Sequence, residues 1–126
     1  MSSNSRVLIV SRDEMLLRTR EMILGAFFSV NGAGRVSEAR ALLAGSSFDL
    51  ILLCHSLSDD ECQQVLDLVE ELEKRPLILA FNGPGNGADK PWADQQLGTD
   101  AGPYGLLKKC AEMLDFTLKS KAKTHA

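Results

Sequence analysis

Residues that could do chemistry are concentrated in one short stretch, FDLILLCHSLSDDE, which covers positions 48–61. Cys54 would be a reactive thiol if a nearby cation, helix N-terminus or base lowered its pKa. His55 is adjacent in sequence, but neighbouring residues of a strand point to opposite faces, so it is a poor base for Cys54. Two alternatives therefore stand for Cys54. It is a reactive thiol, or it is a small and partly buried apolar side chain, which is common for a free cysteine.

The cysteines and histidines do not have the spacing of a metal site. The candidate ligands are Cys54, His55, Cys62 and His125. Zinc motifs place their ligands in close pairs, which this chain lacks. We therefore predict no bound metal and no cofactor. No nucleophile stands beside a base and an orienting group, so the sequence does not predict an enzyme.

The acidic run that follows Cys54 has a structural explanation. Ser58 and Glu61 fit a capping box, in which each side chain accepts a hydrogen bond from the backbone of the other residue. The carboxylates of Asp59 and Asp60 are then favoured by the helix dipole. The sequence therefore predicts a helix after Ser58. Its apolar face carries Cys62, Val65, Leu66, Val69 and Leu72.

The elements that position these residues alternate along the chain. Continuous apolar runs rich in β-branched residues predict buried strands. Such a run covers positions 7–10, and the largely apolar segments 27–30, 48–54 and 77–81 are predicted to be the other strands. Alternation of such strands with helices predicts an α/β protein, with a parallel sheet between two layers of helices. Sites in these folds form at the carboxyl ends of the strands, which here are Ser11, Cys54 and Phe81.

Capping signals place the first two helices. Ser11 and Glu14 fit a capping box, so the first helix is predicted to begin at Ser11 and to end near Gly25. Its apolar face carries Met15, Leu16, Thr19, Met22 and Ile23. Positions 31–34 are predicted to form a turn. Ser37 is predicted to cap the second helix, which ends at Gly45.

The last third of the chain is less regular. Positions 82–91 read NGPGNGADKP, where glycine and proline leave no room for an ordinary helix. The polar segment 93–99 predicts a weak edge strand or an irregular turn. A last helix is predicted over 103–119, with apolar side chains at helical spacing.

Composition limits the domain organisation and the function. Of 126 residues, 44% are apolar, so we expect a single domain over 1–126, with its core at 6–118 and a flexible basic tail at 119–126. The net charge of −3 argues against a nucleic-acid-binding surface. Three cysteines without close spacing do not form a disulfide framework, and no apolar segment is long enough for a signal peptide or a membrane span. We predict a cytoplasmic protein that binds neither nucleic acid nor membranes.

The order of elements resembles the CheY-like receiver domain of two-component response regulators. RVLIV is similar to the first strand of that family, FDLILLC to the third, RPLILAF to the fourth, and GPYGLLKKCAEML to the last helix. The resemblance implies a flavodoxin-like, three-layer αβα sandwich with five parallel strands in the order 2-1-3-4-5. The segment 82–91 would then shorten or replace the fourth helix of the family.

The resemblance also implies a phosphorylation pocket, and this chain departs from it throughout. In the family an acidic pair after the first strand holds Mg²⁺, which prefers carboxylate oxygens. The matching residues are Ser11 and Arg12. The phosphorylated aspartate corresponds to Cys54, and the hydroxyl residue that ends the fourth strand corresponds to Phe81. The lysine that ends the fifth strand corresponds to Thr99.

The alignment of the fifth strand has an alternative. Lys90, Pro91 and Trp92 resemble the Lys-Pro-aromatic signature of the family. This match would make a glycine-rich segment the fifth strand, and glycine weakens strands. In the alignment that ends at Thr99, the aromatic switch position of the family is occupied by Gln96.

We interpret the chain as a degenerate, stand-alone receiver-like domain that signals through protein–protein contacts, without aspartyl phosphorylation. Two alternatives stay open: a relocated phosphoacceptor at Asp59 or Asp60, and a redox sensor at Cys54. The predicted partner is a signalling protein, or a second copy of the chain in a homodimer. Predicted contacts with the partner are made by Trp92, Tyr104, Lys108 and Lys109.

Overall fold

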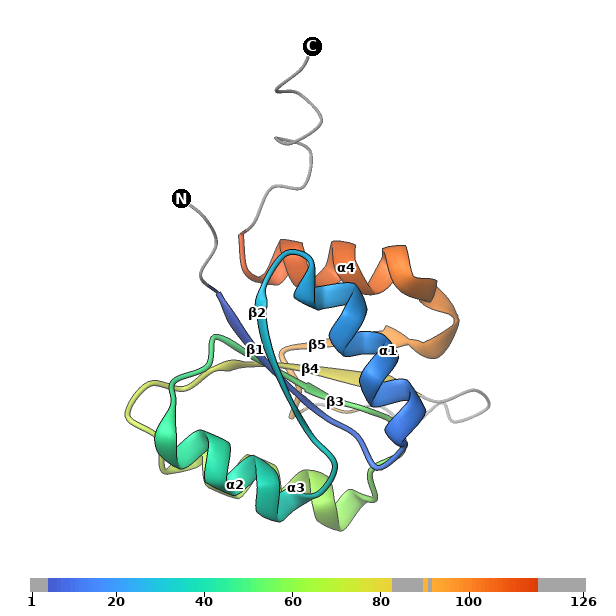
Figure 1. Cartoon of the computed structure of the whole chain (residues 1–126). Helices are drawn as coiled ribbons and strands as arrows, with labels where there is room; N and C mark the ends of the chain where they lie inside the picture. Colours follow the sequence, from blue (N-terminus) through green and yellow to red (C-terminus); the bar gives the residue numbers. More distant parts are fainter. Residues whose placement is uncertain (1–4, 83–89, 91, 116–126) are drawn as a thin grey trace.

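The structure, a computed structural model, describes residues 5–82, 90 and 92–115. It is an αβα sandwich in which one parallel sheet lies between two layers of helices (Figure 1). The five strands are β1 (Arg6–Val10), β2 (Ser29–Ala33), β3 (Leu50–Leu53), β4 (Leu77–Asn82) and β5 (Gln95–Gly98). Their order in the sheet is β2-β1-β3-β4-β5 and every neighbouring pair is parallel, as the resemblance to receiver domains implied.

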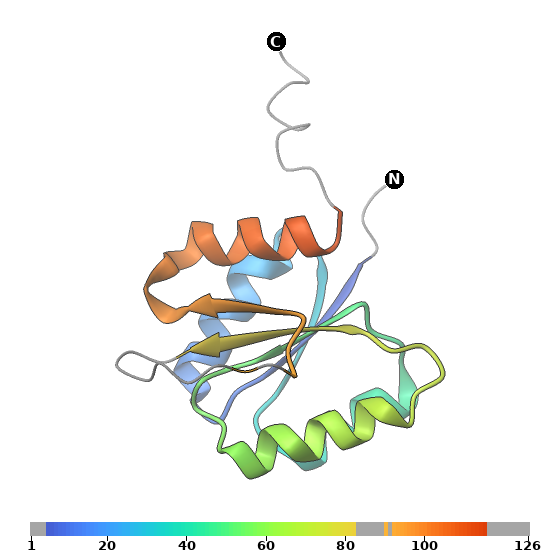
Figure 2. The same ribbon diagram turned by 180° about the vertical axis from the view of Figure 1, so that it is seen from behind.

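Four α-helices cover the two faces of the sheet. They are α1 (Glu14–Gly25), α2 (Val36–Gly45), α3 (Asp59–Glu70) and α4 (Gly102–Met113), and a short 3₁₀ turn, η1 (Thr99–Ala101), precedes α4. Helices α1 and α4 lie on one face, and α2 and α3 lie on the other (Figures 1 and 2). No helix of the described residues is long and apolar enough to cross a membrane.

Alternating side chains of the central strands supply two separate cores. In β1, Val7 and Ile9 pack beneath α1 and α4, whereas Leu8 and Val10 pack beneath α2 and α3. All four are fully buried, because both faces of a central parallel strand are covered. Cys54 belongs to the core beneath α1 and α4. Its side chain therefore points toward α1 and not toward α3.

The first helix begins later than predicted. Ser11 is not its N-cap, because the side chain of Asp13 accepts the hydrogen bond from the backbone N–H of Leu16. Oγ of Ser11 instead accepts a hydrogen bond of 3.2 Å from the backbone N–H of Asp13. The prediction of the buried face of this helix was also wrong in part, because Met15 and Met22 are 74% and 78% exposed. The buried face of α1 consists of Arg20 and Leu24.

The second strand and the second helix also differ from their predictions. Strand β2 covers Ser29–Ala33, so the predicted turn at 31–34 is mostly strand. Pairing of the polar Asn31 and Gly32 with the apolar β1 outweighs their low intrinsic strand propensity. Helix α2 begins after Arg35, which makes no side-chain cap, so Ser37 lies inside the helix and is not its cap.

The end of the chain follows the first of the two predicted alignments. Gln95–Gly98 forms a true strand that pairs with β4, which excludes the alternative in which Lys90 and Trp92 end the fifth strand. The described residues between β4 and β5 contain no helix. Most of the glycine-rich segment, and the predicted tail at 119–126, lie outside the described residues. Helix α4 covers Gly102–Met113, so it ends earlier than the predicted 119. Leu114 is its C-cap, and Asp115 has a φ of 56°, which an α-helix does not allow.

Candidate functional site

The carboxyl ends of β1, β3 and β4 meet at one edge of the sheet, where ligands of open α/β sheets bind. Ser11 follows β1 and donates its backbone N–H to the carbonyl of Ala33, at 3.0 Å. Cys54 follows β3 and donates its backbone N–H to the carbonyl of Val10, at 3.1 Å. Phe81 is a buried residue of β4. The predicted pocket positions at these three strands are therefore close together.

Cys54 is enclosed by an arginine and an aromatic ring. Its side chain is 2% exposed, and Nη1 of Arg20 donates a hydrogen bond to its sulfur at 2.9 Å. The guanidinium carbon of Arg20 lies 4.0 Å from the centroid of the Phe81 ring, which is the geometry of a cation–π contact. Cys54, Arg20 and Phe81 thus form a buried stack, which we call the arginine stack.

Burial raises the pKa of the Cys54 thiol, and the nearby charge of Arg20 opposes this shift without cancelling it. A raised pKa keeps the thiol protonated at neutral pH, and the thiolate is the reactive form. The structure therefore gives no support to Cys54 as a redox sensor. His55 is exposed and lies outside the arginine stack.

Arg12 does not enter the pocket. Its Nη1 pairs with Oε2 of Glu61 in the first turn of α3, and its side chain is 56% exposed. Its backbone N–H donates to Oγ of Ser56 at 3.0 Å, and this hydroxyl also lies 3.2 Å from Oγ of Ser11. Polar side chains of the β1 and β3 loops therefore bind each other across the strand ends.

The capping box at the start of α3 is confirmed. Oγ of Ser58 accepts from the backbone N–H of Glu61 at 3.1 Å, and Oε1 of Glu61 accepts from the backbone N–H of Ser58 at 2.9 Å. The hydrogen bond from the backbone of Ser58, assisted by Arg12, lowers the pKa of Glu61 below its ordinary value. Asp59 and Asp60 are exposed in the first turn of this helix.

A small cavity of about 60 Å³ lies above the ends of β3 and β4. Cys54, Phe81, Asp59, Lys90 and Trp92 are among the residues that line it. Nζ of Lys90 lies 6.0 Å from the centroid of the Trp92 ring, so the lysine lies over the indole. This volume is well below the roughly 150 Å³ that holds a benzene molecule in a protein core.

The strand ends lack the donors of a metal–phosphate site. The side chains at the matching positions are a hydroxyl, a guanidinium, a thiol and an aromatic ring, and none is a carboxylate. These residues are Ser11, Arg12, Cys54 and Phe81. Asp13, the nearest acidic residue in sequence, caps α1. No group of three His, Cys, Asp or Glu side chains within the described residues could hold a metal ion.

Thr99 and the predicted partner contacts lie away from the arginine stack or around its rim. Thr99 is the first residue of η1 and lines a different cavity, together with Arg20. Trp92 is half-buried and packs against the core beneath α2 and α3. Tyr104 is 69% exposed on α4. Lys108 is exposed and Lys109 is half-buried, with its Nζ 3.7 Å from Glu112 Oε1.

Arg20 is the site residue that the sequence analysis missed. Leu16, Arg20 and Leu24 are spaced by four residues, so they share one face of α1. A cation between two leucines on the buried face of a helix is a signal that could have been read from the sequence. The sequence analysis named only Arg12 as the nearby cation, and Arg12 is exposed.

Comparisons with known proteins agree with this geometry at the level of the fold. No protein-family model and no curated protein matches the chain. Solved structures do match. A CheY-like receiver domain from Methanospirillum hungatei is 25% identical, with a TM-score of 0.73, and the match covers 90% of this chain and 95% of that one.

Two bacterial structures are similar to the same extent. A CheY-like receiver domain from Methylobacillus flagellatus is 18% identical with a TM-score of 0.74, and the match covers 88% of this chain and 99% of that one. The chemotaxis response regulator CheY4 of Vibrio cholerae is 20% identical with a TM-score of 0.72, with the same coverage of 88% and 99%. The chain therefore has the fold of CheY-like receiver domains.

Proposed function

We propose that this chain is a pseudo-receiver, a receiver-like domain that takes part in signal transduction through protein–protein contacts and without aspartyl phosphorylation. The observation that carries the proposal is the arginine stack. At the end of β3 there is a buried Cys54 in place of an acidic acceptor, and Arg20 and Phe81 enclose it. It is not an enzyme, and it acts as a binding module.

The fold supports the signalling role, because the structurally similar chains from Methylobacillus flagellatus and Vibrio cholerae are a response regulator receiver domain and a chemotaxis response regulator. The departures at Ser11, Arg12 and Cys54 support the loss of phosphorylation, because Mg²⁺ needs carboxylate oxygens that these side chains do not have. Free cysteines, as at Cys54, favour a reducing compartment such as the cytoplasm.

The partner is a protein of the same signalling pathway, or a second copy of this chain. The exposed Tyr104 and the lysines of α4 are the contacts that we propose for this partner. Tyrosine is enriched at interfaces, since it combines an apolar ring with a polar end. Trp92 contributes less to such a surface, because it packs against the core.

The proposal is tested by incubation of the protein with Mg²⁺ and phosphoramidate, followed by intact-mass spectrometry. We expect no added phosphoryl group. A stoichiometric acyl phosphate on the wild-type chain would overturn the proposal. If its formation were lost in the Asp59→Asn, Asp60→Asn double variant, the relocated acceptor would be the correct function.

A further inference from the structure

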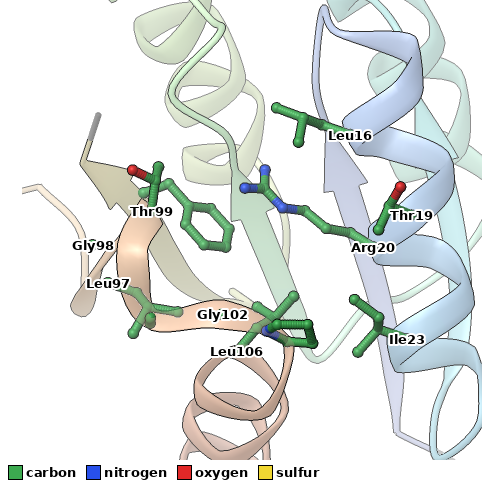
Figure 3. A pocket seen from close by; sticks show the side chains of 12 residues that line it. Leu16, Thr19, Arg20, Ile23, Leu97, Gly98, Thr99, Gly102 and Leu106 are labelled. Carbon is green, nitrogen blue, oxygen red and sulfur yellow. The ribbon is translucent and has the colours of Figure 1, made fainter. Parts of the chain in front are cut away.

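A second cavity lies on the other side of the arginine stack, between α1 and the connection from β5 to α4. Its volume is about 160 Å³. Figure 3 shows the Arg20 side chain extending from α1 into this space, toward the segment that carries Gly98 and Thr99. The cavity opens to solvent, because lining residues such as Thr19 and Gly102 are exposed.

Arg20 brings a positive charge to this cavity, and no described residue pairs it with a carboxylate. The residue is 8% exposed, and none of the ion pairs between described residues involves it. Its guanidinium donates one side-chain hydrogen bond within the described chain, to the sulfur of Cys54, which is a weak acceptor, and its other contact is the neutral ring of Phe81. A guanidinium has five donors in a planar fork, and a buried charge is normally paired. An anion is therefore the missing partner.

The other walls define the kind of anion. Leu16, Ile23, Leu97 and Leu106 give the cavity an apolar surface. The N-terminus of α4 also borders it at Gly102, and this helix has no side-chain cap. The positive end of the helix dipole adds to the charge of Arg20. Phosphate or sulfate would leave the apolar walls unused, whereas a carboxylate with an apolar body would fill both parts.

We propose that this cavity binds a small monocarboxylate, whose carboxylate pairs with the guanidinium of Arg20 and whose apolar body, about the size of a benzene ring, packs against the leucine and isoleucine side chains. The size follows from the volume, since a cavity of about 150 Å³ accommodates benzene. This cavity shares Arg20 and Phe81 with the arginine stack, and Thr99 also lines it. The proposal rests on the charge of Arg20 and on the apolar walls, so it does not depend on the absence of phosphorylation.

Benzoate is a suitable probe, and benzyl alcohol is its uncharged counterpart of similar size. We expect benzoate to bind the wild-type protein saturably, with a dissociation constant of about 1 mM or tighter. Methyl NMR signals of Ile23, Leu97 and Leu106 should shift during the titration. Benzyl alcohol should bind at least about tenfold more weakly, because it cannot form the charged pair.

Arg20→Met tests the role of the guanidinium, and Arg18→Met is its control. Arg18 is an exposed arginine on the same helix, where it pairs with Glu14. We expect Arg20→Met to weaken benzoate binding by about tenfold or more, and Arg18→Met to leave it unchanged. If Arg20→Met does not fold, Arg20→Lys replaces it, and it too should weaken binding because an ammonium lacks the bidentate fork.

Three results would overturn the proposal. The first is the absence of saturable benzoate binding to the wild-type protein. The second is equal binding of benzoate and benzyl alcohol, which would show an apolar cavity without a role for charge. The third is a folded Arg20 variant that binds benzoate as tightly as the Arg18→Met control.

Discussion

Arg20 of α1 donates a hydrogen bond of 2.9 Å from Nη1 to the sulfur of Cys54, beside the end of β3. Both side chains are buried, and the ring of Phe81 covers the guanidinium. A cation and a neutral thiol thus occupy the centre of a site where the resemblance to receiver domains implies an aspartate and Mg²⁺. Contacts among Arg20, Cys54 and Phe81 therefore fill the position at which the resemblance implies the phosphorylation site.

The thiols should react slowly in the folded protein. Burial raises the pKa of Cys54, raises that of Cys62 to about 11 and raises that of Cys110 to about 12. At pH 8 all three are protonated, so iodoacetamide should modify none of them quickly, whereas urea-unfolded protein should react at all three. Mass spectrometry after timed quenching measures this. Rapid and selective modification of Cys54 in the native protein would restore the redox-sensor alternative.

Replacement of Arg20 by an apolar residue of similar length should not destabilise the protein. A buried charge without a carboxylate partner costs desolvation free energy, and Arg20→Met removes that cost while it keeps most of the packing. We expect the free energy of unfolding, from urea denaturation, to stay equal or to rise by about 1 kcal/mol.

Arg20→Ala is the comparison, because it removes the same charge and also leaves a cavity. It should be less stable than Arg20→Met by about 2 kcal/mol. If Arg20→Met were instead as destabilised as Arg20→Ala, the charge of Arg20 itself would be contributing to the stability of the fold.

Alanine variants of Ser58 and Ser37 test which of the two serines caps a helix. Ser58→Ala removes the hydrogen bond to the backbone of Glu61 and should lower the free energy of unfolding by about 1 kcal/mol. Ser37→Ala lies inside α2, without a capping bond, and should change it by less than about 0.5 kcal/mol. Equal losses in the two variants would contradict the cap assignments.

The low pKa of Glu61 links stability to pH. The hydrogen bond from the backbone of Ser58 lowers this pKa from its ordinary value of 4.5, and Arg12 lowers it further. The ionised carboxylate therefore stabilises the fold above pH 4.5, and this contribution is lost as the pH falls through the lowered value.

Glu61→Gln should thus flatten the loss of stability between pH 5 and pH 3, measured by thermal unfolding. Glu70→Gln, at the exposed end of the same helix, is the control and should follow the wild-type profile. A Glu61→Gln profile as steep as that of the wild type would show that other carboxylates govern the acid sensitivity.

The alternation of strands and helices could be predicted from the sequence because apolar runs and capping residues determine the elements locally. The apolar runs at 7–10 and 77–81 predict strands that are covered on both faces, and every residue of these runs except Leu77 is buried in the central strands β1 and β4. The capping box was predictable because its two partners, Ser58 and Glu61, are three residues apart in one local motif. The predictions of helix caps at Ser11 and Ser37 were wrong, because Asp13 caps α1 and Ser37 lies inside α2.

The site was predicted only in part. Cys54 follows β3 and Phe81 lies near the end of β4, as counting along the strands indicated, whereas Arg12 was expected near these residues and Arg20 is found there. Arg12 turns outward because Glu61 offers it a carboxylate at the surface. Which of several arginines is buried depends on the pairing of side chains in three dimensions, and no local spacing determines it.

The most direct test of the proposed function is a Mg²⁺ titration of the wild-type protein, followed by NMR of backbone amides at the strand ends. With a hydroxyl, a thiol and a paired arginine in place of carboxylates, the amide signals of Ser11, Cys54 and Phe81 should not shift in a saturable way at millimolar Mg²⁺. Saturable shifts of these three amides would contradict the proposal, because they would show a working metal site at the ends of β1, β3 and β4.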